Sequence, residues 1–238
     1  MYPAETGIRA DLDRAHRRAW EHVSLVGEWW SAEERRAAAG VVRDAFGDGE
    51  PTPPWSPATG NMSRWSAGTG SRSDDALPAP IIDALYRMTV HAHTITERWY
   101  RQFTQIVVDE QAYVELCGIV SSVVAVCSFA RTVGVEPPPF PPIADAGNSS
   151  TPRRVSTMAD RSPRNWVPVA APGGTRASVV EAFSMSPIEY NLLWDHLAPA
   201  QYMAIEQMSD LAWTRGTLSR PQAELLAGRV AALRQCFF

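Results

Sequence analysis

The sequence contains no lysine, and all 22 of its basic side chains are arginine. Schiff-base enzymes, pyridoxal-phosphate enzymes and P-loop nucleotide-binding proteins each need a lysine amine, so the composition excludes these three classes. The 26 acidic residues outnumber the basic ones and give a formal charge of −4. A protein that wraps nucleic acid usually carries a basic surface, and we therefore expect no nucleic-acid partner.

Cysteine is scarce as well. Cys117, Cys127 and Cys236 are an odd number at wide spacings and include no C-x-x-C pair, so neither a disulfide framework nor a zinc site is indicated. We expect no metal and no cofactor. The first twenty residues lack the apolar run of a secretory signal, which favours a cytoplasmic protein. The longest uncharged stretch, 116–130, is shorter than the ~20 residues that cross a bilayer, and we interpret it as a buried helix without a membrane partner.

Apolar residues recur at steps of three and four along most of the chain, which is the spacing of an amphipathic helix. Two capping boxes, Ser31 with Glu34 and Ser186 with Glu189, each open a helix, and Gly134 followed by Pro137 ends another. No segment alternates convincingly at period two, so the predicted fold class is all-α. The predicted helices cover 9–26, 31–46, 80–105, 109–133, 187–197, 199–214 and 220–238.

Two segments interrupt this pattern. Residues 47–79 are rich in glycine and proline and predict a long loop, in which Trp55 and Trp65 are expected to anchor the chain to the body. Residues 135–178 are rich in proline and predict a connecting arm. The expected organisation is therefore an N-terminal half at 1–134, the arm at 135–178 and a C-terminal half at 179–238.

Three of the predicted helices share one arrangement. They begin at Glu34, Glu115 and Glu224, and each carries a small residue three positions after the glutamate. At the twelfth step they reach Phe46, Cys127 and Cys236. Small residues let two helix backbones approach closely. Tight packing in the core therefore explains the shared arrangement of the three helices, except for the glutamates and cysteines.

The segment 215–238 resembles the catalytic helix of AhpD-like proteins, the alkylhydroperoxidase and carboxymuconolactone decarboxylase group. The family pattern is a glutamate, an apolar helix with small residues, a Cys-x-x-Cys pair and a histidine four residues after the second cysteine. The segments 20–34, 81–100 and 113–120 are similar to the longer, two-domain members, so the resemblance extends over most of the chain. It implies a helical bundle with two related halves.

The resemblance also implies a thiol chemistry. In the family, one cysteine becomes a thiolate with help from a glutamate and histidine relay, attacks a hydroperoxide and is oxidised to a sulfenic acid. The second cysteine then closes a disulfide, which a dithiol partner reduces. Glu224 and Cys236 match the glutamate and the first cysteine, but the sequence given stops at Phe238, before the second cysteine and the histidine.

The other two repeats depart from the pattern more strongly. Cys127 holds the first cysteine position of the Glu115 repeat, while Ala130 and Gly134 stand at the positions of the second cysteine and the histidine. Phe46 and Gly49 replace both cysteines in the first repeat. On a straight helix, twelve residues separate a glutamate from its cysteine by ~18 Å, so contact within one repeat needs a helix break or a glutamate from another repeat.

Two interpretations of this departure stay open: a truncated member of the family, or an intact protein that has abandoned the relay. The leading hypothesis is a protein related to thiol peroxidases but impaired, with Cys236 and then Cys127 as the residual thiol. The alternatives are a cofactor-free enzyme of a biosynthetic pathway, of the lyase or decarboxylase type and acting on a small molecule, and a non-catalytic assembly or binding protein. Because relatives generally associate and the arm is long, we also expect a homo-oligomer.

A further candidate pair lies in the predicted helix 80–105. His93 and Glu97 are four residues apart, so on one helix they share a face and form either an acid–base pair or an ordinary surface pair. His91 and His93 are two apart, diverge by ~200° on a helix and are not expected to hold a metal together.

Overall fold

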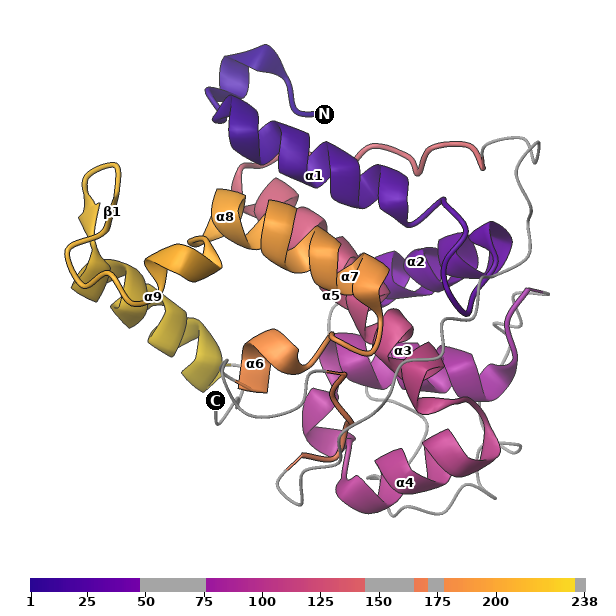
Figure 1. The fold of residues 1–238 in the computed structure, drawn as a ribbon. Helices are drawn as coiled ribbons and strands as arrows, with labels where there is room; N and C mark the ends of the chain where they lie inside the picture. The colour runs from indigo at the N-terminus through magenta and orange to yellow at the C-terminus, as the bar shows by residue number, and fades with distance from the viewer. Residues whose placement is uncertain (48–75, 144–164, 171–177, 234–238) are drawn as a thin grey trace.

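The computed structural model describes residues 1–47, 76–143, 165–170 and 178–233. These residues are mostly helical, which confirms the all-α prediction (Figure 1). Trp55, Trp65 and most of the two predicted linkers lie outside the described residues.

The first part of the chain forms two short 3₁₀ helices, η1 and η3, and longer α-helices. They are η1 (Ala4–Thr6), α1 (Ala10–His22), α2 (Ala32–Gly47), α3 (Ala79–Val90), η3 (Ala92–Thr94), α4 (Glu97–Ile106) and α5 (Glu110–Thr132). The last part consists of α6 (Ser178–Glu181), α7 (Pro187–Asn191), η4 (Leu192–Leu197), α8 (Ala198–Gln201), η5 (Ile205–Gln207), the strands β1 (Thr214–Arg215) and β2 (Leu218–Ser219), and α9 (Arg220–Leu233).

Helix α5 is the centre of the core, close to the predicted bounds 109–133. Asp109 caps its start by accepting a hydrogen bond from the backbone N–H of Gln111 at 2.9 Å. Gly134 ends it with a φ of 73°, a left-handed conformation that glycine adopts without steric cost. The helix is long and apolar enough to cross a membrane, but 67% of its most apolar window is buried inside the protein. That burial is typical of a core helix.

The capping box predicted at the start of α2 is confirmed. The backbone N–H of Glu34 donates to Ser31 Oγ at 3.2 Å, and the Glu34 carboxylate accepts from the N–H of Ser31 at 2.8 Å. Helices α1, α2 and α3 pack around α5 (Figure 1). The start of the proline-rich segment turns back onto α1, where Phe140 stacks on Trp20 with ring centroids 4.4 Å apart.

The single helix predicted at 80–105 is wrong, because the chain breaks into α3, η3 and α4. His91 leaves the helical conformation with φ −134° and ψ 39°, and the Thr94 hydroxyl donates to its carbonyl at 2.7 Å. Thr96 then caps α4 by accepting from the N–H of Trp99. Threonine hydroxyls compete with the helical ladder for backbone groups, which explains why the apolar period continues while the helix does not.

The predicted helix at 199–214 is also wrong. The helix that begins at Pro187 continues as one rod through α7, the π-helical η4 and α8, and ends at Gln201. Arg215 donates to the carbonyls of Pro199 and Tyr202, which satisfies backbone groups at this end. The chain then forms η5 and the β1–β2 hairpin, whose turn contains Gly216 at φ 57°.

The rod from α7 to α8 packs against α1 and α5, as Figure 1 shows. Leu192, Leu197 and Ala200 belong to the same hydrophobic core as the N-terminal helices. Within 220–233, by contrast, Ala223 is the only buried residue of α9, which contacts the hairpin at the edge of the protein. The packing of α5 and α9 therefore differs, and the division into two related halves stays a prediction.

Candidate functional site

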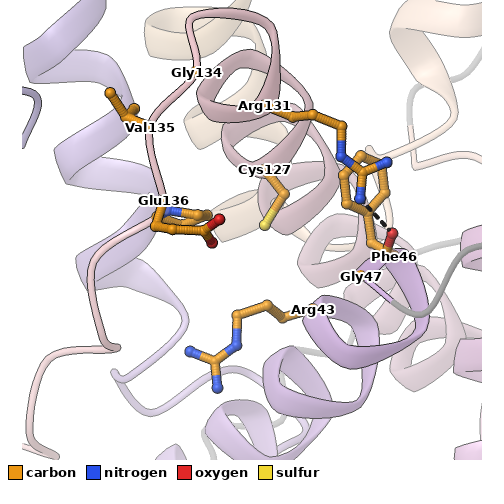
Figure 2. Close-up of a pocket in the computed structure, with 9 residues that line it drawn as sticks. Arg43, Phe46, Gly47, Cys127, Arg131, Gly134, Val135 and Glu136 are labelled. Atoms are coloured by element: carbon orange, nitrogen blue, oxygen red, sulfur yellow. Dashed lines mark hydrogen bonds between the residues drawn. The ribbon is translucent and has the colours of Figure 1, made fainter.

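Cys127 lies in the wall of a cavity of about 590 Å³ between the ends of α2 and α5 (Figure 2). Arg43 from α2, Arg131 from α5 and Glu136 from the following segment also line it. The Arg131 guanidinium donates to the carbonyl of Phe46 at 2.8 Å and lies over the Phe46 ring, 4.3 Å from its centroid. The cavity lining therefore combines three charged side chains with one buried cysteine.

The surroundings of Cys127 do not activate its sulfur. Burial raises the pKa of the thiol to about 11, even though Arg43 and Arg131 act in the opposite direction. The other cysteine of the helix, Cys117, contacts Met88 Sδ at 3.5 Å, and burial raises its pKa to about 12. Cys117 and Cys127 are ten residues apart on one helix, so their α-carbons are ~15 Å apart and the two cysteines cannot form a disulfide.

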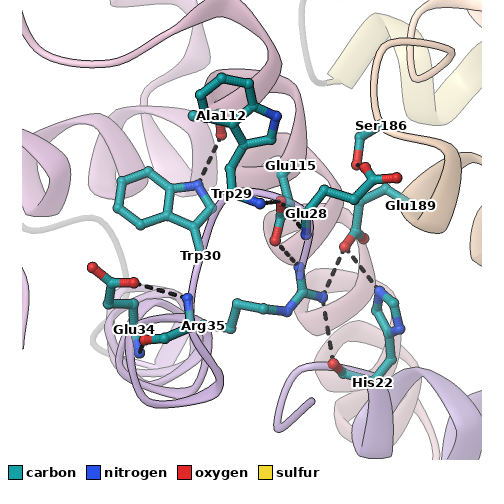
Figure 3. Close-up of polar contacts among 11 residues, drawn as sticks. His22, Glu28, Trp29, Trp30, Glu34, Arg35, Ala112, Glu115, Ser186 and Glu189 are labelled. Atoms are coloured by element: carbon teal, nitrogen blue, oxygen red, sulfur yellow. Dashed lines mark hydrogen bonds and ion pairs between the residues drawn. The ribbon is translucent and has the colours of Figure 1, made fainter. Parts of the chain in front are cut away.

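Glu115, the glutamate of this repeat, belongs to a buried polar cluster (Figure 3) and does not line the cavity beside Cys127. Its side chain is fully buried and pairs with the guanidinium of Arg35, which is also fully buried. Its second oxygen accepts from the backbone N–H groups of Glu28 and Trp29 at 3.1 and 2.8 Å. The carboxylate is thus held on both oxygens by groups of α2 and of the turn before it.

Arg35 joins Glu115 to a second buried carboxylate, Glu189 of α7. Arg35 Nη2 lies 2.8 Å from Glu189 Oε1, and His22 Nε2 at the end of α1 lies 2.8 Å from the same oxygen. Burial acts to raise the pKa of Glu189, but the charges of Arg35 and His22 outweigh it and lower the pKa to about 2. Arg35 also donates to the carbonyl of His22, so one guanidinium links α1, α2, α5 and α7.

A third carboxylate, Glu28, borders the same cluster. The hydroxyl of Ser186 donates to Glu28 Oε2 at 2.8 Å, and both residues are buried. Burial raises the pKa of Glu28, and the negative charge of Glu189 adds to this shift. Ser186 was expected to cap α7 together with Glu189, but its side chain makes no capping hydrogen bond. Both side chains of that predicted capping box instead contact other parts of the chain, Ser186 with Glu28 and Glu189 with Arg35.

Two glycines make room for the buried carboxylates. A Cβ on Gly27 would overlap with Glu115 Oε1, and a Cβ on Gly118 would overlap with the Glu189 carboxylate. Gly118 is the small residue three positions after Glu115 in the repeat. Its counterpart in α9, three positions after Glu224, is Ala227, which is exposed. The α9 repeat therefore does not enclose a buried carboxylate at this point, as the α5 repeat does.

The remaining predicted site residues are not brought together. Glu224 is half exposed on α9, where its carboxylate accepts from Tyr202 Oη and Arg220 Nε at 2.6 Å each. Cys236 lies outside the described residues. Because the helix breaks at His91, His93 belongs to η3 and Glu97 to α4, and they do not share the face of one helix.

Glu97 pairs instead with Arg101 across 3.4 Å on the surface of α4. In the part of the chain that the structure describes, no three histidine, cysteine, aspartate or glutamate side chains are grouped closely enough to hold a metal ion. The absence of a metal and of a cofactor stays a prediction.

The sequence reasoning missed Arg35, Glu189, His22 and Glu28 as members of one site. One signal was present, because Arg35 shares its helical face with Ala38, Ala39 and Val42. A charged residue on the apolar face of a helix needs a buried partner. No comparable signal existed for Glu189, since its partner in the cluster is 154 residues away in the sequence.

Comparison of the chain with known protein families, with curated proteins and with solved structures yields no match.

Proposed function

We propose that this chain is an AhpD-like protein related to thiol-dependent alkyl hydroperoxide reductases, cytoplasmic, and impaired as a peroxidase. Its helical fold, the repeated glutamate helices and the cysteine at the end of α5 support the relationship. The cavity beside Cys127 supports a residual reaction with a small peroxide.

The conclusion that the relay is impaired rests on the position and the hydrogen bonds of Glu115. A carboxylate that passes a proton to a cysteine must come within hydrogen-bond reach of it. Glu115 and Cys127 lie on the same uninterrupted helix, twelve residues or ~18 Å apart, and both oxygens of Glu115 are already bound. Cys127 therefore has no proton relay from the glutamate of its own repeat.

The buried thiol itself adds a second barrier to peroxide reduction. A pKa of about 11 leaves about 10⁻⁴ of Cys127 as thiolate at pH 7. An ordinary cysteine with a pKa of about 8.5 would be a few per cent thiolate at the same pH. We therefore expect Cys127 to react with peroxide about 300-fold more slowly than a free thiol of ordinary pKa.

The expected result of a peroxidase assay is little turnover with dihydrolipoamide as the reductant, measured as loss of hydrogen peroxide or of an alkyl hydroperoxide at pH 7. The physical reason is the lack of a thiolate, a relay and a neighbouring resolving thiol among the described cysteines. Cys127→Ser should remove the slow reaction at the cavity, while Cys117→Ser on the same helix is the matched control and should not change it.

Cys236 requires a separate variant because it lies outside the described residues. Its match to the first cysteine of the family pattern predicts that Cys236→Ser abolishes whatever peroxide turnover remains. Fast turnover that survives both Cys127→Ser and Cys236→Ser would show that the site assignment is wrong. Fast turnover that one of them abolishes would show that a resolving thiol completes the reaction.

Homo-oligomerisation is part of the proposal. Helix α9 exposes Leu225, Leu226, Val230 and Leu233, each more than half accessible to solvent. Apolar side chains gathered on one helix are typical of a surface that another chain covers, and the α9 repeat resembles the buried α5 repeat. We expect light scattering at micromolar concentration to give a mass of at least twice 26.2 kDa, whereas a monomeric mass would contradict the expectation.

A cofactor-free enzyme of the lyase or decarboxylase type is the second candidate. One observation favours it: His22 is paired with a buried carboxylate and lies at the wall of a second, larger cavity. A histidine held by a carboxylate is the arrangement that acid–base catalysts use.

A further inference from the structure

The second cavity lies between α1 and the η4–α8 part of the rod and has a volume of about 780 Å³. From α1 it is lined by Arg14, Arg18 and His22, which follow one another at steps of four and so share one helical face. Asp195 and His196 line the opposite wall. Its size is within the range of small-molecule sites.

His22 is the part of the buried cluster that reaches this cavity. Its side chain is 16% exposed, whereas Arg35 is fully buried and Glu189 is 1% exposed. In Figure 3, Nε2 of His22 points to Glu189 and the other ring nitrogen points away from it. The cluster therefore fixes one edge of the imidazole and leaves Nδ1 as the edge without a partner among the described residues.

The charge on Glu189 determines which nitrogen of His22 carries the hydrogen. Paired with the Arg35 guanidinium, Glu189 is ionised at neutral pH and can only accept hydrogen bonds. Nε2 of a neutral His22 must then donate, and Nδ1 has the free electron pair. Arg35 and the space beside Gly118 hold the Glu189 carboxylate in place. Glu189 in turn fixes the orientation of the His22 ring.

The cavity wall carries three arginines, Arg14, Arg17 and Arg18, and three carboxylates, Asp11, Glu21 and Asp195. Arg14 and Arg18 are exposed, and neither has an ion pair or hydrogen bond to another described residue, whereas the neighbouring Arg17 is paired with Asp13. None of the described residues that line this cavity is a serine, threonine or cysteine. An acyl-enzyme route therefore lacks its attacking group, while a carboxylate ligand has two available guanidinium groups.

We propose that this cavity binds small 2-oxo carboxylates and that His22 Nδ1 acts as a general base on the carbon next to their carbonyl group. The Nδ1 electron pair takes a proton from that carbon, and the C–H electron pair becomes the double bond of an enolate whose negative charge lies on the carbonyl oxygen. The imidazolium then returns a proton to the carbon. Nothing is oxidised or reduced. Arg14 and Arg18 hold the carboxylate, and Glu189 and Arg35 position the imidazole.

This proposal does not depend on the thiol chemistry, and it is tested by isotope exchange. The full chain is incubated with sodium pyruvate in D₂O, and the loss of the methyl proton signal is followed by NMR. We expect exchange faster than with the same concentration of free imidazole and saturation as pyruvate is increased. Acetone, which has the same acidic methyl groups but no carboxylate, should exchange without saturation.

Two variants locate the reaction. His22→Gln keeps a donor for Glu189 but removes the base, and should slow exchange by about 100-fold or more. Arg18→Gln changes an exposed residue, so it preserves the fold and should raise the half-saturating pyruvate concentration about tenfold. Arg98→Gln, on the exposed surface of α4, is the control of equal charge and should behave as the unmodified chain.

The outcomes separate the parts of the proposal. Exchange no faster than with free imidazole overturns it, and so does equal exchange by the unmodified chain and a folded His22→Gln. If His22→Gln does not fold, the Arg18→Gln result decides: an unchanged half-saturating concentration overturns the carboxylate site, and a raised one supports it.

Discussion

Replacing Arg35 with methionine is expected to lower the free energy of unfolding by about 3–5 kcal/mol, because it leaves two buried carboxylates without their shared cation. Glu115 and Glu189 are both at least 99% buried, and Arg35 contacts each of them. Urea unfolding followed by circular dichroism measures the loss. Methionine keeps most of the side-chain volume, so the loss reports on charge more than on packing.

Arg36→Met is the matched control, one position along the same helix. Arg36 is only partly buried and has no ion pair among the described residues, so we expect its replacement to change the free energy of unfolding by less than about 1 kcal/mol. Adding Glu115→Gln and Glu189→Gln to Arg35→Met should restore part of the stability, since it removes the uncompensated charges. Equal losses in Arg35→Met and Arg36→Met would contradict the structural role of the cluster.

Alanine at Gly118 is expected to destabilise the protein by about 1–3 kcal/mol, although alanine favours helices. The added Cβ would occupy the space of the Glu189 carboxylate, which Arg35 and His22 prevent from moving away. Gly27→Ala should cost at least as much, because its Cβ would overlap with Glu115 and approach Arg35 as well. Thermal unfolding monitored by circular dichroism gives the comparison.

Gly40 and Gly228 are controls for this comparison. Both lie inside helices and have no atom within 4 Å of an added Cβ. Gly40→Ala and Gly228→Ala are therefore expected to stabilise the protein by about 0.5–1 kcal/mol through helix propensity alone. If these two variants destabilise the protein as much as Gly118→Ala does, overlap with the Glu189 carboxylate is not the cause of the loss in Gly118→Ala.

The local sequence determined much of the helical structure. The apolar period together with stop residues predicted α5 nearly to the residue, and the Ser31 and Glu34 capping box predicted the start of α2. These features depend on groups within four residues of one another, so the sequence alone contains them. The same reasoning failed at His91 and after Gln201, where threonine hydroxyls and the distant Arg215 take backbone carbonyls.

The sequence identified Glu115 as a residue that needs explanation but not its partner. Only the tertiary structure decided that Glu115 meets Arg35 and that Glu189, predicted as a helix cap, completes an ion cluster with His22. The separations along the chain are 80, 154 and 167 residues. A buried charge must be compensated by whichever opposite charge the packing of helices brings near it, and helix periodicity fixes the face of a residue, not the helix that it faces.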